Sequence, residues 1–307
     1  MSALAVLWFF LIFVLIAGYF VLDGFDLGVG VLYRALAKTD AERALVRRSI
    51  GPVWDGNEVW LLTAGGALFA AFPAAYATTF SGFYLAVMLV LFGLIVRAVS
   101  LEFGAHDPKW GRAWDACFTI GSFLPALLLG VALGNVIAGV PLAENGDYAG
   151  VPLLGLLSPF TLVVGALGFA MCMAAGAAWV SLKTERTSAV HGRAEKQRRV
   201  WHVVVLVLFV AETVLAFAVV KPQFAPGMLV AGAIFAIAFV VCIAASIAQA
   251  KKGNDLAAFV LQSIAASSDT SLAWMTGIAC IGVPLVLVYH VIAYRVFSGR
   301  LAEEDVA

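Results

Sequence analysis

The residues of this chain that could do chemistry are acids standing beside long apolar segments. Asp23 and Asp26 lie three residues apart in GYFVLDGFDLGVG, so they share one helix face. A second group stands in GPVWDGNEVW and consists of Asp55, Asn57 and Glu58. Acids next to membrane segments are costly, which makes them functional candidates by default. Carboxylates, an amide and bound water are the groups that proton uptake requires, so we expect a proton inlet here.

Composition indicates what surrounds these acids. Of the 307 residues, 63% are hydrophobic and only 12% are charged, whereas a soluble domain carries about 25% charged residues. The chain is therefore expected to be a polytopic membrane protein with one transmembrane domain over residues 1–307. Its formal net charge is zero, which indicates no nucleic-acid partner.

The four cysteines do not suggest a metal centre or a disulfide framework. All lie inside apolar segments, and neither CxxC nor a Cys/His ligand spacing occurs in the chain. We interpret them as small core residues, so no metal site is expected. They are Cys117, Cys172, Cys242 and Cys280.

Apolar segments predict an all-α transmembrane helix bundle. A spanning helix needs roughly 20 apolar residues, and eight segments meet that length. No Lys or Arg precedes the first, so we interpret it as a span rather than a signal peptide. A ninth segment, 254–268, is short, and whether it crosses is doubtful, so we expect about nine spans. The eight clear segments are 3–22, 56–76, 79–97, 115–139, 154–182, 201–220, 227–249 and 272–297.

Basic residues predict the orientation. Lys and Arg fall in the loops after the first, third, fifth and seventh spans, whereas the alternate loops hold only Lys221. Such an excess marks cytoplasmic loops, which places the N-terminus outside. If 254–268 crosses, Arg295 and Arg300 also lie inside, so nine crossings predict a cytoplasmic C-terminus. The polar stretch 183–200 is then expected to be a solvated cytoplasmic connection.

With this topology, acids from several helices meet at one membrane level. Asp23 and Asp26 end the first span, residues 55–58 open the second, and Arg97 closes the third. An Arg among carboxylates at the edge of a low-dielectric region can keep them ionised. The whole candidate proton path consists of Asp23, Asp26, Asp55, Asn57, Glu58, Arg97, Glu102 and Asp115.

A simpler interpretation exists for each acid taken singly. Asp55 is also an ordinary first-turn acid favoured by the helix dipole. Asp23 and Asp26 could be an interfacial helix end that touches water. Trp54 and Trp60 fit the aromatic belt at the membrane surface, although Trp60 could instead face a partner or a cavity.

Small residues and isolated polar residues complete the pattern. Gly24, Gly28 and Gly30 permit close helix approach, and the small-residue face at 64–67 suggests tight helix packing.

Glu212 is the one acid deep in an apolar segment and is expected to be protonated or paired. His202 and His290 lie at different depths, so we favour satisfied or interfacial histidines over haem ligands.

Several long stretches resemble subunit II of the cytochrome bd-type quinol oxidases. The resemblance is close over roughly residues 1–140 and resumes in SSDTSLAWMTGIACIGVPLVLVYHVIAYRVFSGRL. Motifs of this length are specific. The first region contains GYFVLDGFDLGVG, PVWDGNEVWLLTAGGALFAAFP, FSGFY, RAVSLEF and WDACFTIGSFLPALLLGVALGNVIAGVPL.

The resemblance implies an accessory subunit of an enzyme that oxidises quinol and reduces oxygen to water. Haem b and haem d are then carried by the partner, subunit I, and none is ligated by this chain. Asp23, Asp26 and Asp55, with Arg97 nearby, match the family's proton path, and Trp60 matches a wall residue of its oxygen route. A structural quinone, a small additional subunit and a bacterial inner-membrane location are further implications.

Two departures from the family and two alternative functions stay open. The outside loop KPQFAPG is abbreviated, and the region between Lys252 and Leu272 lacks most of the family's eighth span. The alternatives are a stand-alone transporter or channel with an acidic cytoplasmic ion site, and a haem-binding electron-transfer protein. Against the first, no broken-helix pair or matched midplane site is visible.

Overall fold

The computed structural model describes residues 3–104, 106–144, 148–220 and 226–267, and over these ranges the chain is helical, with no strand. This confirms the all-α prediction. Three short elements are η1 (Pro108–Trp110), η2 (Leu154–Leu156) and the π-helical turn η3 (Ala216–Val220). The α-helices are α1 (Ala3–Leu36), α2 (Asp40–Ile50), α3 (Trp54–Ala71), α4 (Pro73–Gly82), α5 (Tyr84–Gly104), α6 (Gly111–Ala138), α7 (Pro159–Lys183), α8 (Ala189–Leu215), α9 (Pro226–Lys251) and α10 (Asp255–Ser267).

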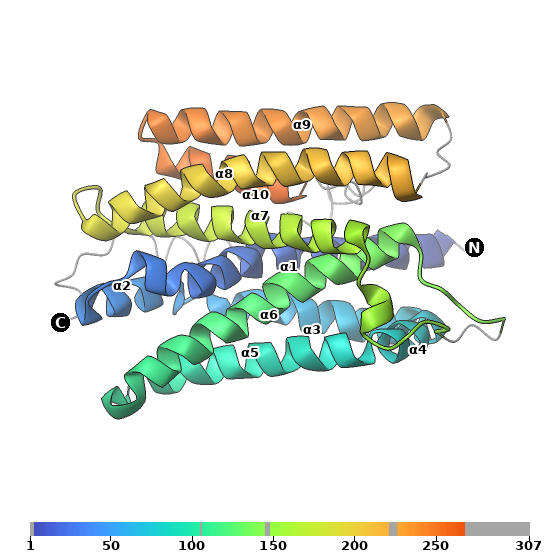
Figure 1. Ribbon diagram of the computed structural model, residues 1–307, viewed down its shortest axis with the longest axis horizontal. Coiled ribbons are helices and arrows are strands. Elements are labelled where there is room, and N and C mark those ends of the chain that lie inside the picture. The colour runs from blue at the N-terminus through green and yellow to red at the C-terminus, as the bar shows by residue number, and fades with distance from the viewer. Residues whose placement is uncertain (1–2, 105, 145–147, 221–225, 268–307) are drawn as a thin grey trace.

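The long helices lie side by side along one axis, with α7 near the centre (Figure 1). Helix α7 packs against α1, α6, α8 and α10, while α5 packs on α6 and α3 packs on α1. The aromatic side chains of Phe25 on α1 and Trp179 on α7 stack at 4.4 Å between ring centroids. The core therefore runs along the seam between α1, α6 and α7.

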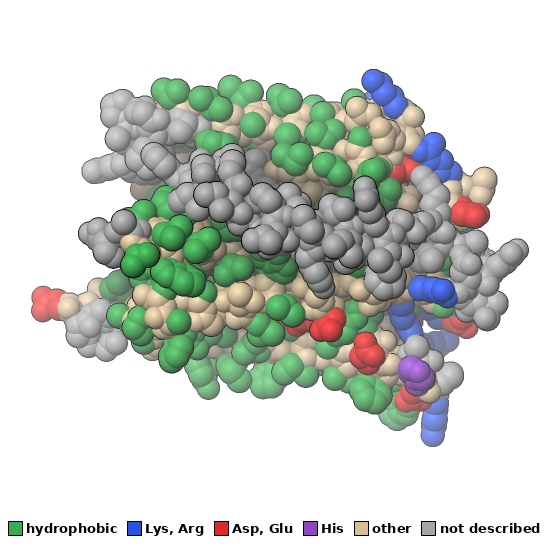
Figure 2. Space-filling model, turned by 180° about the vertical axis from the view of Figure 1, so that it is seen from behind, with side chains coloured by type: hydrophobic (Ala, Val, Ile, Leu, Met, Phe, Trp, Pro, Cys, Tyr) green, Lys and Arg blue, Asp and Glu red, His purple; other side chains and the backbone are tan. Residues whose placement is uncertain are grey.

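Six helices of the described residues are long and apolar enough to cross a membrane. Their side chains are hydrophobic along most of the molecule, whereas the Lys and Arg side chains gather at one end in Figure 2. This is a multi-pass membrane protein. The expected last span, 272–297, lies outside the described residues, so nine crossings and the cytoplasmic C-terminus stay predictions.

The first helix is longer than predicted. Instead of ending near residue 22, α1 continues to Leu36, so Asp23 and Asp26 lie inside it and not at its end. The fall in hydropathy after Leu22 suggested a helix end, but a polar side chain does not break backbone hydrogen bonding. No proline interrupts this stretch, and packing against α6 and α7 stabilises a helix that its glycines alone would weaken.

The predicted second and third spans are divided differently. Helix α3 ends at Ala71, and the ten-residue α4 follows before α5 begins at Tyr84. Pro73 opens α4, where its missing N–H group costs no helical hydrogen bond. The chain therefore bends at Phe72 and at Phe83, not at residues 77–78 as the apolar pattern suggested.

The predicted connection before α8 is mostly helical. Helix α8 begins at Ala189, twelve positions before the expected start, and includes most of the basic stretch. Ser188 caps it, with its side chain accepting a hydrogen bond from the His191 amide. Glu195 forms ion pairs with Arg198 and Arg199, three and four residues later. Local capping and charge pairing thus extend the helix into water.

The doubtful segment 254–268 is helix α10, which has 13 residues. At 1.5 Å per residue it is roughly 20 Å long, less than the ~30 Å hydrocarbon core. It packs against α9, α7 and α1. The described part of α10 alone is therefore too short to span the hydrocarbon core, and whether this segment crosses stays a prediction.

Candidate functional site

A fully buried ion pair joins α1 and α5. Arg97 donates from Nη1 and Nη2 to the two carboxylate oxygens of Asp23, at 2.8 and 2.5 Å. Neither side chain is exposed to solvent. A bidentate pair satisfies both partners where isolated charges would be costly. Arg97 of α5 therefore lies beside an acid of α1.

Asp26 lies one turn further along α1 and accepts a hydrogen bond from a neutral group. Asn57 donates from Nδ2 to Asp26 Oδ2 at 2.8 Å and to the Leu22 carbonyl at 3.2 Å. Asp26 Oδ1 is buried and has no hydrogen-bond partner. The amide of Asn57 thus fixes the start of α3 against α1 and holds Asp26 in place.

The other two acids of α3 are less buried. Glu58 is partly buried and lies within electrostatic range of Arg97, Asp23 and Asp55. Asp55 is exposed in the first turn of α3, as the helix-dipole interpretation expects. We define the buried acid cluster as Asp23, Asp26, Asn57, Glu58 and Arg97.

Asp115 does not join this cluster. It pairs with Arg47 Nη2 at 2.7 Å and with Arg43 Nε at 3.4 Å, two side chains of α2. Asp115 and both arginines line a pocket of about 890 Å³, and so does the exposed Glu102. The eight predicted path residues therefore divide into a buried cluster, a basic pocket and the exposed Asp55. Helix α2, whose two arginines form ion pairs with Asp115, was not predicted from the sequence.

Trp54 stands between the two parts. Its side chain lines the pocket, and the Arg97 guanidinium carbon lies 6.0 Å from the centre of its ring. The pocket therefore approaches the buried acid cluster on the side that Trp54 covers. The belt interpretation of Trp54 overlooked this contact because it considers only membrane depth.

Glu42 connects α2 to α8 near the pocket. Burial disfavours its charge, but an ion pair with Arg193 of α8 and hydrogen bonds from the amides of Lys38 and Thr39 outweigh burial and lower the pKa of Glu42. Thr39 and Glu42 form a capping box at the start of α2. The helix that carries the pocket arginines is therefore anchored to α8.

Glycines set how closely the helices approach. A Cβ atom at Gly28 would collide with the Cys172 carbonyl of α7, and one at Gly176 would collide with the α1 backbone. This confirms the close approach predicted for α1. In contrast, a Cβ atom at Gly65 or Gly66 would meet no described atom within 4 Å. Among the described residues, Gly65 and Gly66 therefore contact no neighbouring helix, whereas Ala64 of the same stretch is buried.

Sequence analysis missed several buried hydroxyl groups. Tyr19 and Tyr33 on α1 and Thr119 on α6 each have a buried hydroxyl oxygen without a hydrogen-bond partner. Tyr19 and Tyr33 lie four residues before Asp23 and seven after Asp26. That helical spacing was the available signal, because it places all four on one face of α1.

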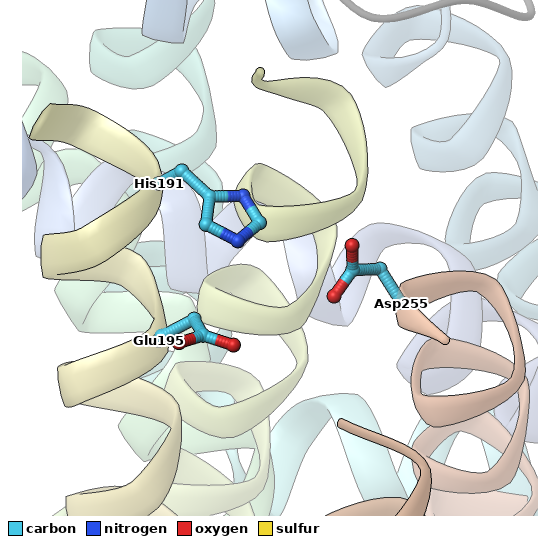
Figure 3. A group of neighbouring side chains, drawn as sticks. All are labelled: His191, Glu195 and Asp255. Atoms are coloured by element: carbon cyan, nitrogen blue, oxygen red, sulfur yellow. The ribbon is translucent and has the colours of Figure 1, made fainter. Parts of the chain in front are cut away.

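A second polar group joins α8 and α10. The ligand atoms of His191, Glu195 and Asp255 lie within 4.8 Å of one another, and Figure 3 shows the three side chains facing a common space. Arg198, only 2% exposed, reaches Glu195 at 3.2 Å and Asp255 at 3.9 Å. A guanidinium thus already bridges the two carboxylates where a cation would bind. We interpret the group as an ion-pair network.

Two of the described histidines, His202 and His106, contact other polar groups. His202 Nε2 lies 2.7 Å from Gln262 Oε1, and His106 Nδ1 lies 3.0 Å from the Glu102 carbonyl oxygen. His290 lies outside the described residues.

Comparisons with known proteins find relatives along most of the chain. The family model for cytochrome bd terminal oxidase subunit II matches residues 4–297. Cytochrome bd-I ubiquinol oxidase subunit 2 of Escherichia coli (strain K12) is 42% identical over 214 residues, which is 68% of this chain and 56% of the relative. Cytochrome bd ubiquinol oxidase subunit 2 of Bacillus subtilis (strain 168) is 38% identical over 221 residues, or 71% and 63%. The chain thus aligns with little more than half the length of these relatives.

A solved structure shares the fold. The bd oxidase from Geobacillus thermodenitrificans matches with a TM-score of 0.67 at 15% identity, over 89% of this chain and 84% of that chain. The family model covers nearly the whole sequence, and relatives well above 30% identity cover two thirds of it. On these grounds the chain belongs to the cytochrome bd terminal oxidase subunit II family.

Proposed function

We propose that this chain is the haem-poor subunit of a membrane quinol:oxygen oxidoreductase and that it supplies protons from the cytoplasm. Two curated relatives are named as subunits of ubiquinol oxidases. The quinol is then the electron donor, and haem b and haem d belong to subunit I. We place the heterodimer in the bacterial inner membrane, with room for a small additional subunit and a structural quinone.

The observation that carries the proton role is the contrast between two buried acids. Asp23 is neutralised by a bidentate bond from Arg97, whereas Asp26 accepts a hydrogen bond from the uncharged amide of Asn57. Both carboxylate oxygens of Asp23 are occupied by the guanidinium, so Asp23 fixes the geometry. An acid hydrogen-bonded to an amide can take up and release a proton with less disturbance. Asp26 is therefore the proton-carrying group of the cluster.

The pocket provides the cytoplasmic mouth of this inlet. It contains Glu102 and Asp115 and reaches Trp54, behind which Arg97 lies. Asp55 and Glu58 extend the acidic surface at the start of α3. Oxygen reduction consumes protons, and drawing them from the cytoplasm moves charge across the membrane without a pump. A funnel of acids and arginines at this end serves that purpose.

Trp60 fits a wall position of the oxygen route. Its ring packs on Gly18 of α1, where a Cβ atom would collide with it. The side chain is only partly buried within this chain. We propose that its remaining face contributes to an apolar passage shared with subunit I.

The test replaces Asp26 by Asn in the assembled heterodimer and measures quinol-driven oxygen consumption. We expect a loss of roughly 100-fold or more, in the range of general acid–base effects, with unchanged haem content. Glu185→Gln is the control, because Glu185 is an exposed loop acid away from the cluster. Oxygen consumption at the parent level would overturn the inlet. Loss of the complex itself would show that Asp26 is structural.

A further inference from the structure

We propose that three buried hydroxyl groups, Tyr33 on α1 and Thr119 and Ser122 on α6, form a relay that carries protons from the pocket to Asp26. We call them the hydroxyl seam. The inference rests on the proposed function, since it names the route by which the buried acid cluster is supplied.

Helical register places the seam between the two sites. Tyr33 follows Asp26 by seven residues on α1, which is two turns or roughly 10 Å along the same face. On α6, Thr119 and Ser122 follow Asp115 by four and seven residues, again on one face. Both helices therefore present hydroxyl groups toward the level of the buried acids.

The outer end of the seam touches the pocket. Tyr33 is fully buried, and the Arg47 guanidinium carbon lies 5.3 Å from the centre of its ring. Arg47 in turn bonds Asp115, and both line the pocket. The Tyr33 hydroxyl lies close enough to interact electrostatically with both groups but makes no hydrogen bond with favourable geometry.

The inner end lies against α1, where α6 also approaches the backbone of α5. A Cβ atom on Gly30 of α1 would collide with Ser122 Oγ, so this hydroxyl sits directly against α1, one turn from Asp26. A Cβ atom on Gly121 would lie 2.7 Å from the backbone nitrogen of Arg97. Ser122 Oγ donates to the Phe118 carbonyl at 2.8 Å, which leaves its lone pairs available as acceptors.

The unpartnered hydroxyl groups indicate where water binds. A buried hydroxyl without a partner is costly, and a bound water is the usual way to satisfy it. Tyr33 and Thr119 each have such an oxygen. In a relay, each hydroxyl accepts one proton on a lone pair and passes on the proton that it carried. Its charge is unchanged afterwards, and one proton has moved inward.

The direct route through Trp54 lacks this chemistry. An indole ring offers one N–H donor and no acceptor, so it cannot receive a proton and pass one on. Trp54 covers Arg97 on the pocket side. A proton therefore bypasses the ring along the seam.

The experiment compares Tyr33→Phe and Thr119→Val in the assembled heterodimer with Asp26→Asn. Both variants keep the shape of the side chain and remove only its hydroxyl function. The matched controls are Tyr76→Phe on α4 and Thr213→Val on α8, which lie outside the seam. Oxygen consumption, haem content and the solvent deuterium isotope effect are measured for each.

We expect either seam variant to lower oxygen consumption several-fold, less than Asp26→Asn does, and to raise the isotope effect, with haem content unchanged and both controls normal. A larger isotope effect reports slower proton supply, which a merely structural change would not produce. Normal turnover and a normal isotope effect in Tyr33→Phe and Thr119→Val, with Asp26→Asn impaired, would overturn the seam and leave the inlet standing. If Asp26→Asn is also normal, the proposed function fails as well. Thr119→Val, whose bulk is unchanged, decides the question if Tyr33→Phe does not assemble.

Discussion

Arg97 and Asp23 form a two-point ion pair between α5 and α1 in which neither side chain reaches solvent. A buried pair of this kind is destabilised far more by losing one partner than by losing both, because the remaining charge stays without compensation. The pair therefore fixes the positions of two helices around Asp26.

Removing one partner tests this directly. Asp23→Asn or Arg97→Met alone should lower the stability of the chain by about 3–5 kcal/mol, and the double variant should recover part of the loss. The measurement is the thermal unfolding of the detergent-solubilised heterodimer for all three variants. If the double variant is as damaged as the sum of the single ones, the two residues do not act as a pair.

Close helix approach predicts a second effect. Gly28→Ala should prevent assembly or strongly lower the unfolding temperature, because the new methyl group would collide with the Cys172 carbonyl of α7. Gly192→Ala at the start of α8 is the control, since no atom lies within 4 Å of its Cβ position. Alanine there should be neutral or stabilising by up to ~1 kcal/mol. Equal behaviour of the two variants would contradict the packing of α1 on α7.

The capping box of α2 predicts a pH dependence. Glu42 has a lowered pKa, so its contribution to stability is complete above its ordinary pKa of 4.5 and is lost as pH falls through the lower folded value. Glu42→Gln should therefore reduce stability near pH 7 and flatten its decline at acidic pH. Unfolding temperatures of parent and variant between pH 3 and 7 provide the measurement, and parallel curves would argue against the effect.

The cap itself is tested separately. Thr39→Ala removes the side chain that accepts from the Glu42 amide and should cost about 1 kcal/mol. Thr39→Ser keeps the acceptor and should restore most of it. An alanine variant as stable as the serine variant would show that the cap contributes nothing.

Membrane orientation can be tested on described residues. Cysteine at Glu185, between α7 and α8, should react with an impermeant thiol reagent only from the cytoplasmic side. Cysteine at Ala143, between α6 and α7, should react only from the outside. Both positions are exposed. Labelling of both from one side would reject the orientation inferred from the basic residues.

The sequence by itself determined that this protein is built of apolar helices and which polar side chains accompany them. Long apolar segments require helices, because backbone groups in lipid must bond within their own segment. Two acid motifs contain Asp23, Asp26 and Asn57, and a third stretch contains Arg97. These four residues do lie together. Those inferences depend on residue type and spacing, which are local properties.

Only the tertiary structure decided how the acids are partnered. Sequence cannot tell that Arg97 binds Asp23 rather than Asp26, that Asp115 is taken by arginines of α2, or that α1 continues to Leu36. Nor does it reveal hydroxyl groups without partners, such as that of Tyr33. These outcomes depend on helix rotation and on contacts between segments far apart in the chain, and the packing of glycine backbones against neighbouring helices fixes both.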